Sequence, residues 1–398
     1  YGAHIDVVDP ATGTCDSTGD GSPAERPPAV TSGRSVLALF VLSIGLLPAE
    51  SGRAENSAAA DAAPGRSLTI VPFPFLFYQD ETELGGGGSL SFITRRQVEG
   101  ARAENSGIVV IYTARQQYSI AAEVERFFDE ERWHLLARLG FEEFPADFFG
   151  FGNDTPSDGD EVFTPRGIVG EATLEHQFTG RWRTGPRLRV RTREIVETES
   201  GGALETLRPN GVDGADVVSL GWALVHDGRD HVFYPRDGWW MRVGTDVALT
   251  ALGSDDAFTE HQLDLRAYRG LGDGPFTVAT RFVLRHVSGD VPFDLQPTLG
   301  GAQLLRGYFG GRFRDRSLYA LQGELRVGHW NRLGAVAFAG LGRVTNGLDA
   351  LTLADLHFNY GLGLRLQLSA EEKLHVRADL GLAEDGGSGF YLAFQEAF

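Results

Sequence analysis

The sequence predicts an all-β protein, a sixteen-stranded antiparallel transmembrane β-barrel. Three observations lead to this prediction. Apolar and polar residues alternate over most of the chain, many alternating segments run for ten residues or more, and a short apolar stretch near the N-terminus has the pattern of a secretory signal. Alternation gives each strand one apolar and one polar face. A soluble sandwich would alternate too, but its strands average about five or six residues, whereas a membrane crossing needs about nine to eleven.

Composition agrees with such a barrel and disfavours other classes. A net charge of −18 argues against nucleic-acid binding, because phosphate contacts need a basic surface. Glycine accounts for 52 of 398 residues and aromatics for 11%, which suits strands and turns. No run of about 18 apolar residues could form a membrane-spanning helix. The mean hydropathy of −0.16 still suits a barrel, since only alternate residues face lipid.

The N-terminal part of the chain reads as targeting sequence. Arg34 precedes an apolar core over residues 35–47, and small residues follow through Ala60. The alternative is a buried helix of a soluble domain. The only cysteine, Cys15, lies before this core, so no disulfide framework is expected in the exported part. The predicted organisation is a disordered or untranslated leader (1–33), a signal peptide (34–60), a short linker (61–67) and the barrel (68–398).

The alternation is clearest near the C-terminus and in one arginine-rich strand. Every even position from Leu356 to Leu368 is apolar, with polar residues or glycine between. In a membrane barrel the apolar face meets lipid and the charges line the lumen. Buried charges persist only when they are paired or hydrated, so they either hold an inserted loop or line a pore. The charged residues expected to point inward are Arg187, Arg189, Arg191, Arg193, Arg281, Arg285, Glu324, Arg326, Arg365, Arg377 and Asp379.

About sixteen alternating segments can be counted, and an even number places both ends of a bacterial barrel in the periplasm. Short and long connections alternate; the long ones span 144–165, 198–215 and 289–316 and are expected outside the cell. The segments are 69–78, 86–95, 107–113, 118–128, 133–143, 166–179, 186–197, 216–226, 239–251, 258–270, 276–288, 317–329, 333–344, 356–368, 373–383 and 389–398.

One longer string carries a family resemblance. Thr298–Tyr308 ends in Arg306-Gly307-Tyr308, and Arg314-Asp315-Arg316 and Gln322-x-Glu324-x-Arg326 follow. This string resembles the outer-membrane barrel superfamily of the BamA/TamA assembly factors, the two-partner secretion transporters and the bacterial surface antigens. The resemblance implies that Arg306 lies at the tip of the sixth extracellular loop, which folds back into the lumen. The segment count agrees, because it places Arg306 between the eleventh and twelfth strands.

Other strings add to the resemblance. Phe148–Thr155 is similar to an aromatic-glycine-asparagine-aspartate segment of the family's third outer loop, and Asp227–Gly238 to the turn before its ninth strand. The last residues resemble the targeting signal that the outer-membrane assembly machinery reads. That signal is expected to run to the end of the last strand, with Glu396 at the periplasmic rim, and its residues are Phe390, Leu392, Phe394 and Phe398.

The chain also departs from the family pattern. Strand thirteen of the family carries an aspartate that pairs with the loop arginine, but here the matching string is Phe338–Gly342. We therefore expect Arg306 to reach the polar row of Gln322, Glu324 and Arg326, most directly Glu324. Few residues separate the predicted signal from the first strand, so no periplasmic POTRA domain is expected.

Enzyme chemistry finds no support. No hydrolase or metalloprotease motif occurs, and the four glycines 85–88 lack the lysine of a phosphate-binding loop. The acidic stretch 154–161 could bind calcium, but a solvated loop is the simpler interpretation. We expect neither cofactor nor metal.

The predicted function is protein insertion or translocation at the outer membrane. Its expected partners are outer-membrane lipid, the assembly machinery during biogenesis and a polypeptide cargo. Pro72 and Pro74 remove two backbone donors from the first strand, which favours a weak seam between first and last strands. The alternatives are a stand-alone pore or surface receptor barrel, and a soluble periplasmic β-protein.

Overall fold

The computed structural model describes residues 66–79, 82–96, 104–157, 159–330, 332–369 and 373–398. The predicted leader and signal peptide, and residues 61–65 of the predicted linker, lie outside the described residues. The first strand begins at Arg66, so the last two residues of that linker belong to the strand.

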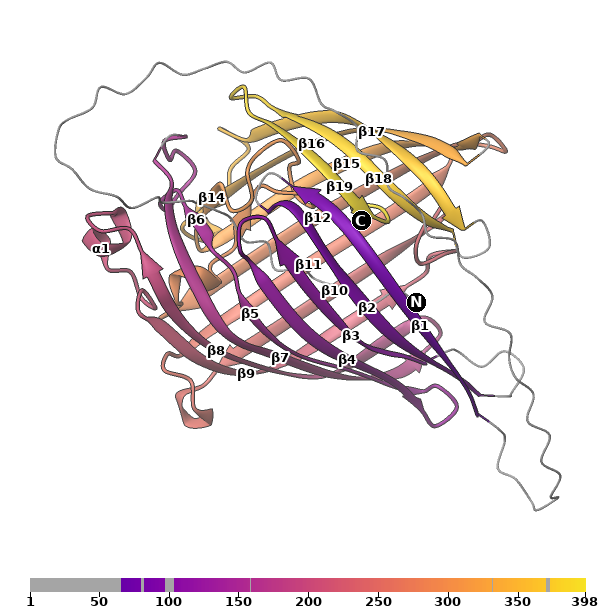
Figure 1. Cartoon of the computed structure of the whole chain (residues 1–398), viewed down its shortest axis with the longest axis horizontal. Coiled ribbons are helices and arrows are strands. Elements are labelled where there is room, and N and C mark those ends of the chain that lie inside the picture. The colour runs from indigo at the N-terminus through magenta and orange to yellow at the C-terminus, as the bar shows by residue number, and fades with distance from the viewer. Residues whose placement is uncertain (1–65, 80–81, 97–103, 158, 331, 370–372) are drawn as a thin grey trace. The chain divides into compact units, whose positions relative to one another are not determined.

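The described strands form a closed antiparallel barrel (Figure 1). The main sheet has 17 strands, of which β6 (Ala146–Phe148) is a short extension beside β7, so sixteen long strands make the wall. This confirms the predicted sixteen-stranded barrel. The wall strands are β1 (Arg66–Gln79), β2 (Glu83–Arg96), β3 (Glu104–Thr113), β4 (Tyr118–Phe128), β5 (Trp133–Glu143), β7 (Glu161–Thr179), β8 (Trp182–Thr198), β9 (Gly214–Asp227), β10 (Gly238–Ala248), β11 (Phe258–Gly270), β12 (Phe276–Gly289), β15 (Ser317–Trp330), β16 (Leu333–Thr345), β17 (His357–Ser369), β18 (Leu374–Ala383) and β19 (Ser388–Phe394).

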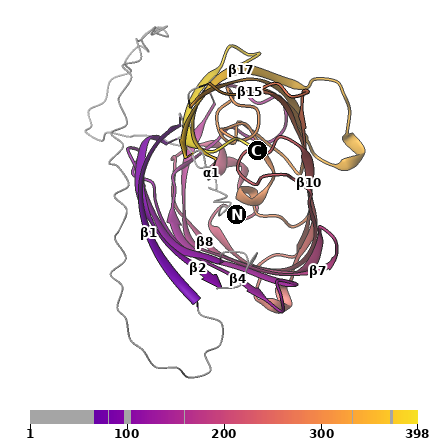
Figure 2. The ribbon, with the colours of Figure 1, turned by 90° about the vertical axis from the view of Figure 1, so that its right-hand side faces the viewer.

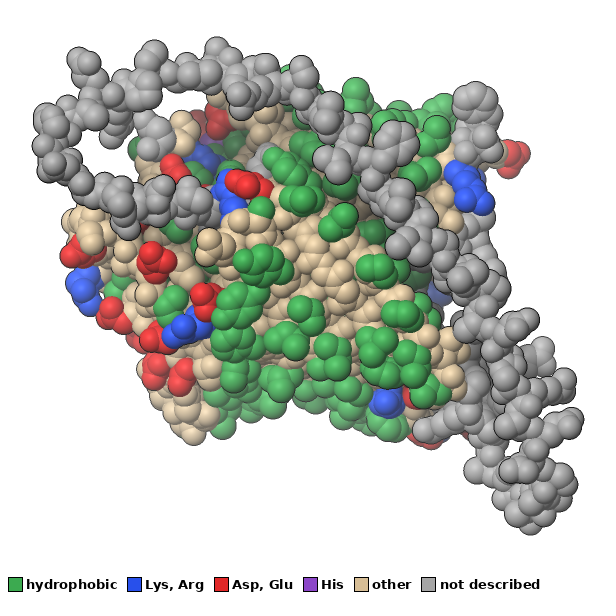
Figure 3. All heavy atoms as spheres, viewed as in Figure 1, with side chains coloured by type: hydrophobic (Ala, Val, Ile, Leu, Met, Phe, Trp, Pro, Cys, Tyr) green, Lys and Arg blue, Asp and Glu red, His purple; other side chains and the backbone are tan. Residues whose placement is uncertain are grey.

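The two faces of the wall follow the sequence alternation. On β17, Leu362 is 69% exposed on the outer face, whereas Arg365 is fully buried on the inner face. Figure 3 shows hydrophobic side chains over the middle of one outer face and charged side chains gathered toward the end where α1 lies. In the described part of the chain, no helix is long and apolar enough to cross a membrane.

Several strand boundaries differ from the prediction by a few residues, and three of the differences have a clear structural reason. β7 begins at Glu161, five residues early, because its extension pairs with β6. β10 ends at Ala248 instead of residue 251, since Thr250–Leu252 forms the 3₁₀-helix η1. β19 ends at Phe394 instead of residue 398, where the backbone of Gln395 adopts a φ of 63°. A left-handed residue cannot continue a strand, so the chain turns away from the wall there.

The long connections at one end of the barrel pack together and partly fill its mouth. They carry α1 (Ala203–Leu207), η2 (Phe293–Leu295), η3 (Leu348–Ala350) and the two-residue strands β13 (Thr298–Leu299) and β14 (Phe313–Arg314). Figure 2 looks along the barrel and shows loop segments within the ring of strands. A buried cluster of Phe148, Phe163, Leu204 and Phe293 joins three of these connections to the wall.

Candidate functional site: the luminal ion network and the strand seam

The loop between β12 and β15 brings Arg306 against the inner face of the barrel. Arg306 is 1% exposed. Its Nη2 donates to Glu324 Oε1 of β15 at 2.5 Å, and its Nη1 donates to Asp379 Oδ2 of β18 at 2.6 Å. The guanidinium also lies 3.6 Å from the ring centroid of Phe338 on β16. Hydrogen bonds between charged groups are stronger than neutral ones, so the loop is bound to three strands at once.

The two carboxylates that hold Arg306 are shared with further arginines. Arg326 pairs with Glu324 at 2.7 Å. Arg365 and Arg377 pair with Asp379 at 2.5 and 2.9 Å. A buried charge is stable only when it is paired and hydrogen-bonded, and removing one partner from such a group is strongly destabilising. The network therefore constrains the loop and strands β15, β17 and β18 as one unit.

Polar contacts fix the loop backbone next to Arg306. Gln322 Oε1 accepts from the backbone N–H of Leu305, and the Asn359 amide donates to the carbonyl of Arg306 at 2.6 Å. Gly307, with a φ of 115°, donates its backbone N–H to the Tyr391 hydroxyl of β19 at 3.0 Å. A Cβ at Gly307 would lie 2.8 Å from the backbone of Leu382, so only glycine fits this approach.

The third residue of the Arg-Gly-Tyr string is also buried. The Tyr308 hydroxyl donates to the carbonyl of Phe358 at 3.2 Å, and its ring packs edge-on against Phe313. Burial raises the pKa of Tyr308 well above its usual range. Burial lowers the pKa of Arg314 to about 10, against the opposing charge of Asp294. The loop environment therefore disfavours uncompensated charge.

The Phe148–Thr155 string packs on the same loop. Asn153 Oδ1 accepts from the backbone N–H of Val344, and the Gly152 backbone N–H donates to the carbonyl of Arg314 at 2.8 Å. The Arg312 guanidinium donates to the hydroxyl of Thr155 at 2.5 Å. These contacts join the third outer connection to the Arg306 loop.

The last four residues form a part of the network that the sequence did not predict. After Gln395 the chain turns inward, and Glu396 pairs with Arg365 at 2.7 Å, both side chains being buried. The sequence did not predict this contact: Glu396 points inward because its carboxylate accepts from Nε of Arg365, a donor that Asp379 leaves free. Phe398 packs with Tyr268 and Ala279 and accepts from Arg326 through its backbone oxygen at 2.8 Å. Phe390, Leu392 and Phe394 remain on the outward-facing positions of β19.

The Asp227–Gly238 string forms the turn between β9 and β10. Asp227 holds Arg229 at 2.8 Å, and Asp230 accepts from the backbone N–H of Arg236 at 2.9 Å. These contacts order the turn. Tyr234 is buried with its ring centroid 4.8 Å from that of His375 on β18. The turn thus packs against the same strands as the ion network.

The seam between the first and last strands is weakly paired. β1 pairs with β2 along all 14 of its residues. With β19 it shares one register pair, Tyr78 and Leu392. The rings of Phe73 on β1 and Phe394 on β19 are in edge-on contact, with their centroids 5.2 Å apart. Side-chain contact replaces much of the backbone ladder at this seam.

A family model for the Omp85 superfamily domain matches residues 100–376. The chain belongs to the Omp85 superfamily. Among solved structures, this Omp85 barrel is similar to BamA from Haemophilus ducreyi lacking POTRA domains 1–3, with a TM-score of 0.57, 13% identity, and coverage of 83% of this chain and 70% of that one. CdiB from Acinetobacter baumannii gives a TM-score of 0.50, 11% identity, and coverage of 82% and 65%. At these identities the likeness shows the barrel fold. Together with the family match, it indicates an integral outer-membrane protein. No curated protein sequence matches the chain.

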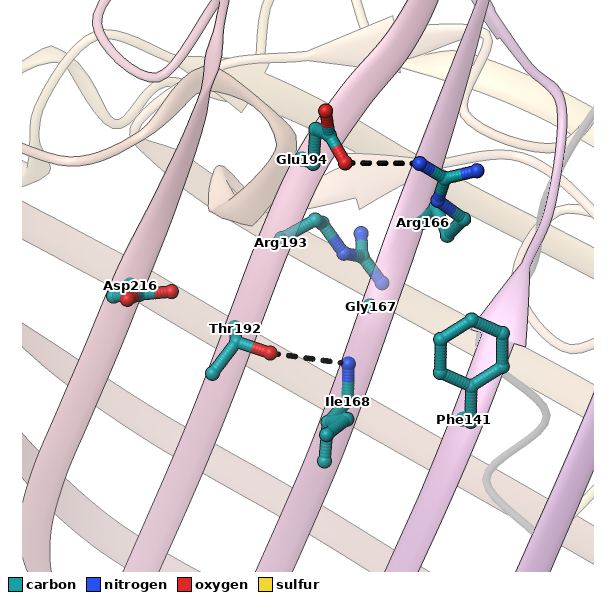
Figure 4. A pocket seen from close by; sticks show the side chains of 8 residues that line it. All are labelled: Phe141, Arg166, Gly167, Ile168, Thr192, Arg193, Glu194 and Asp216. Atoms are coloured by element: carbon teal, nitrogen blue, oxygen red, sulfur yellow. Dashed lines mark hydrogen bonds and ion pairs between the residues drawn. The ribbon is translucent and has the colours of Figure 1, made fainter.

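The Omp85 barrel also has a shallow hollow on its outer wall (Figure 4), with a volume of about 290 Å³. Arg166 binds Glu194 at 3.0 Å, Arg193 is paired with Asp294 and Glu142, and Thr192 accepts from the backbone N–H of Ile168. The lining of this hollow therefore does not indicate a catalytic or ligand-binding site. Within the described residues, no group of three or more His, Cys, Asp or Glu could hold a metal ion. The lining residues are Phe141, Arg166, Gly167, Ile168, Thr192, Arg193, Glu194 and Asp216.

The structure brings together all six predicted loop and strand residues of the Omp85 barrel, Arg306 to Tyr308 with Gln322, Glu324 and Arg326. Reasoning from the sequence missed that Asp379 is a second acceptor for Arg306. Its inward orientation followed from the alternation of β18, but nothing in the sequence placed it beside the loop. Asn359 and Tyr391 were missed for the same reason.

Proposed function

We propose that this Omp85 barrel inserts or translocates polypeptides at the outer membrane of a Gram-negative bacterium, and that it does so by opening between β1 and β19. The observation that carries the proposal is the single register pair, Tyr78 with Leu392, at a seam where β1 has 14 residues and β19 has 7. Every other neighbouring pair of wall strands shares a longer ladder, so this is where the wall opens at least cost.

An open β1 edge suits a polypeptide cargo. A strand with unpaired backbone donors and acceptors is a template for an added strand, and strand addition is a common way to bind an extended peptide. Pro72 and Pro74 lack backbone N–H groups, which reduces the pairing that β1 can make with β19 in the closed state.

The ion network supports a controlled opening. Gly307 donates to Tyr391 of β19, and Arg306 binds Asp379 of the neighbouring β18. The loop therefore holds β18 and β19, the strands on one side of the seam. Movement at the seam would involve β1 and β2 relative to a fixed β15–β19 group.

A disulfide across the seam tests the proposal. Tyr78→Cys and Leu392→Cys, in a Cys15→Ser background, place the two cysteines at the one register pair. The oxidised barrel in proteoliposomes should fail to insert a reporter outer-membrane protein, and reduction should restore insertion. Leu364→Cys with Ala378→Cys is the matched control, since these residues are a register pair of β17 and β18. Full insertion by the oxidised seam variant would exclude opening at this place.

A further inference from the structure

The inner face of β8 is a row of arginines. Alternate residues of a strand share a face, and Arg187 points inward because it pairs with the buried Asp246 of β10. The row faces the lumen in a chain whose net charge is −18. Its members are Arg183, Arg187, Arg189, Arg191 and Arg193.

Three members of the row are neutralised by carboxylates from neighbouring elements. Arg187 binds Asp246. Arg189 binds Glu260 of β11 at 2.7 Å. Arg193 binds Asp294 of η2 at 2.9 Å and also pairs with Glu142 of β5. These arginines have structural partners, and their charges are already balanced.

Arg191 differs from these three. Its register partners are Val169 on β7 and Val217 on β9, which offer no acceptor. Two carboxylates are close enough for their charge to act on Arg191, Glu142 and Asp294, but both are bound by Arg193. Among the inward arginines whose side chains the structure describes, it is the one without a hydrogen bond or ion pair, and its side chain is partly exposed. A guanidinium stays charged at any physiological pH and presents a planar fork of donors that matches a carboxylate. Arg191 is therefore available to an anion in the lumen.

The inner face of β1 carries aromatic residues instead of arginines. The chain of register pairs from Arg191 leads across β7, β5, β4, β3 and β2 to Phe73 on β1, so the two residues share the inner face. Phe75 and Phe77 follow on that face, over Gly87 and Gly85. The rings of Phe73 and Phe75 contact Phe394 of β19. The aromatic part of β1 is therefore packed at the seam, and the cationic part on β8 is the part of this face that a ligand in the lumen could meet.

We propose that Arg191 is a carboxylate-binding position of the lumen, and that its occupant is an acidic side chain of an extended polypeptide. The polypeptide occupant rests on the proposed function, whereas the carboxylate site rests on Arg191 alone. An extended segment presents its side chains to two sides in turn. A cargo segment that alternates acidic and apolar residues can therefore turn all its acidic side chains toward the cationic part of this wall.

Fluorescence anisotropy tests the proposal with the full chain in detergent. The probe is a labelled peptide of alternating glutamate and valine, compared at fixed ionic strength with one of alternating lysine and valine. The acidic peptide should bind and the basic peptide should not. Arg191→Gln should weaken acidic-peptide binding by about tenfold or more, the effect of losing one charge-assisted contact. Arg191→Lys should retain part of the affinity, because it keeps the charge and loses the fork.

Arg166→Gln is the matched control, because it removes the same charge from the outward face of β7 (Figure 4) and should leave binding unchanged. Equal binding to wild type and Arg191→Gln, in protein that still shows heat-modifiable migration, would overturn the site. Displacement of the peptide by acetate at an equal carboxylate concentration would show binding of small carboxylates and overturn the polypeptide occupant. The seam disulfide should not alter peptide binding, so failure of the insertion assay and failure of this one are distinguishable.

Discussion

Arg306 and Asp379 are 73 positions apart in the chain, yet the loop guanidinium and the β18 carboxylate lie 2.6 Å apart inside the barrel. Asp379 is also bound by Arg365 and Arg377, so it is the point where the loop, β17 and β18 meet. Asp379 on β18 thus binds the loop arginine in place of the aspartate that the family pattern has on the strand of Phe338–Gly342.

Arg306→Ala should release the loop. The change leaves Glu324 and Asp379 without one partner each. Removing one partner from a buried ion pair lowers the free energy of unfolding by about 3–5 kcal/mol. We expect faster proteolysis between residues 289 and 316 and a lower temperature of heat-modifiable unfolding. Arg316→Ala is the control in the same loop, because the Arg316 guanidinium donates to the backbone carbonyl of Gly289 and is not bound to the buried network. Proteolysis at the wild-type rate would contradict a docked loop.

Double-mutant cycles should separate the two acceptors of Arg306. Arg306→Ala combined with Glu324→Ala, and Arg306→Ala combined with Asp379→Ala, should each cost less than the sum of the single changes, because both cycles remove directly contacting partners. The measurement is the midpoint of urea unfolding monitored by gel migration. Simple additivity in either cycle would show that the pair in question is not coupled.

Gly307→Ala should displace the loop even though the arginine is intact. Its added Cβ would lie 2.8 Å from the Leu382 backbone, and its φ is 115°. Gly311→Ala is a matched control with a φ of 71° but no atom nearer than 3.9 Å, so it carries the left-handed cost of about 1–2 kcal/mol without the clash. The Gly307 variant should be more sensitive to protease than the Gly311 variant. Equal sensitivity would mean that close packing on β18 is unimportant.

Removal of residues 390–398 should abolish heat-modifiable migration on gels. The deletion removes most of β19 together with the inward tail. β1 then has no partner across the seam, and Arg365 no longer pairs with Glu396. Phe398→Ala removes one buried ring and should keep the closed form, with unfolding at a lower temperature. A truncated protein that migrates as wild type would remove the argument that this strand closes the barrel.

The sequence by itself determined the barrel, the approximate strands and the face on which each strand residue lies. A strand places alternate side chains on opposite faces whatever it pairs with. The two-residue alternation can therefore be recognised from the sequence of each strand alone. That is why the inward positions of Arg365, Arg377 and Asp379 could be predicted one strand at a time. The family resemblance added the loop string around Arg306.

Only the tertiary structure decided which inward residues meet. Contact between Arg306 and Asp379 depends on the path of a long loop and on the register of strands far apart in the chain, neither of which has a local signal. The inward turn at Gln395 likewise depends on Arg365 and Arg326, which are available only once the wall has closed. The single seam pair, Tyr78 with Leu392, is a property of closure itself, because it is set where the two ends of the sheet meet.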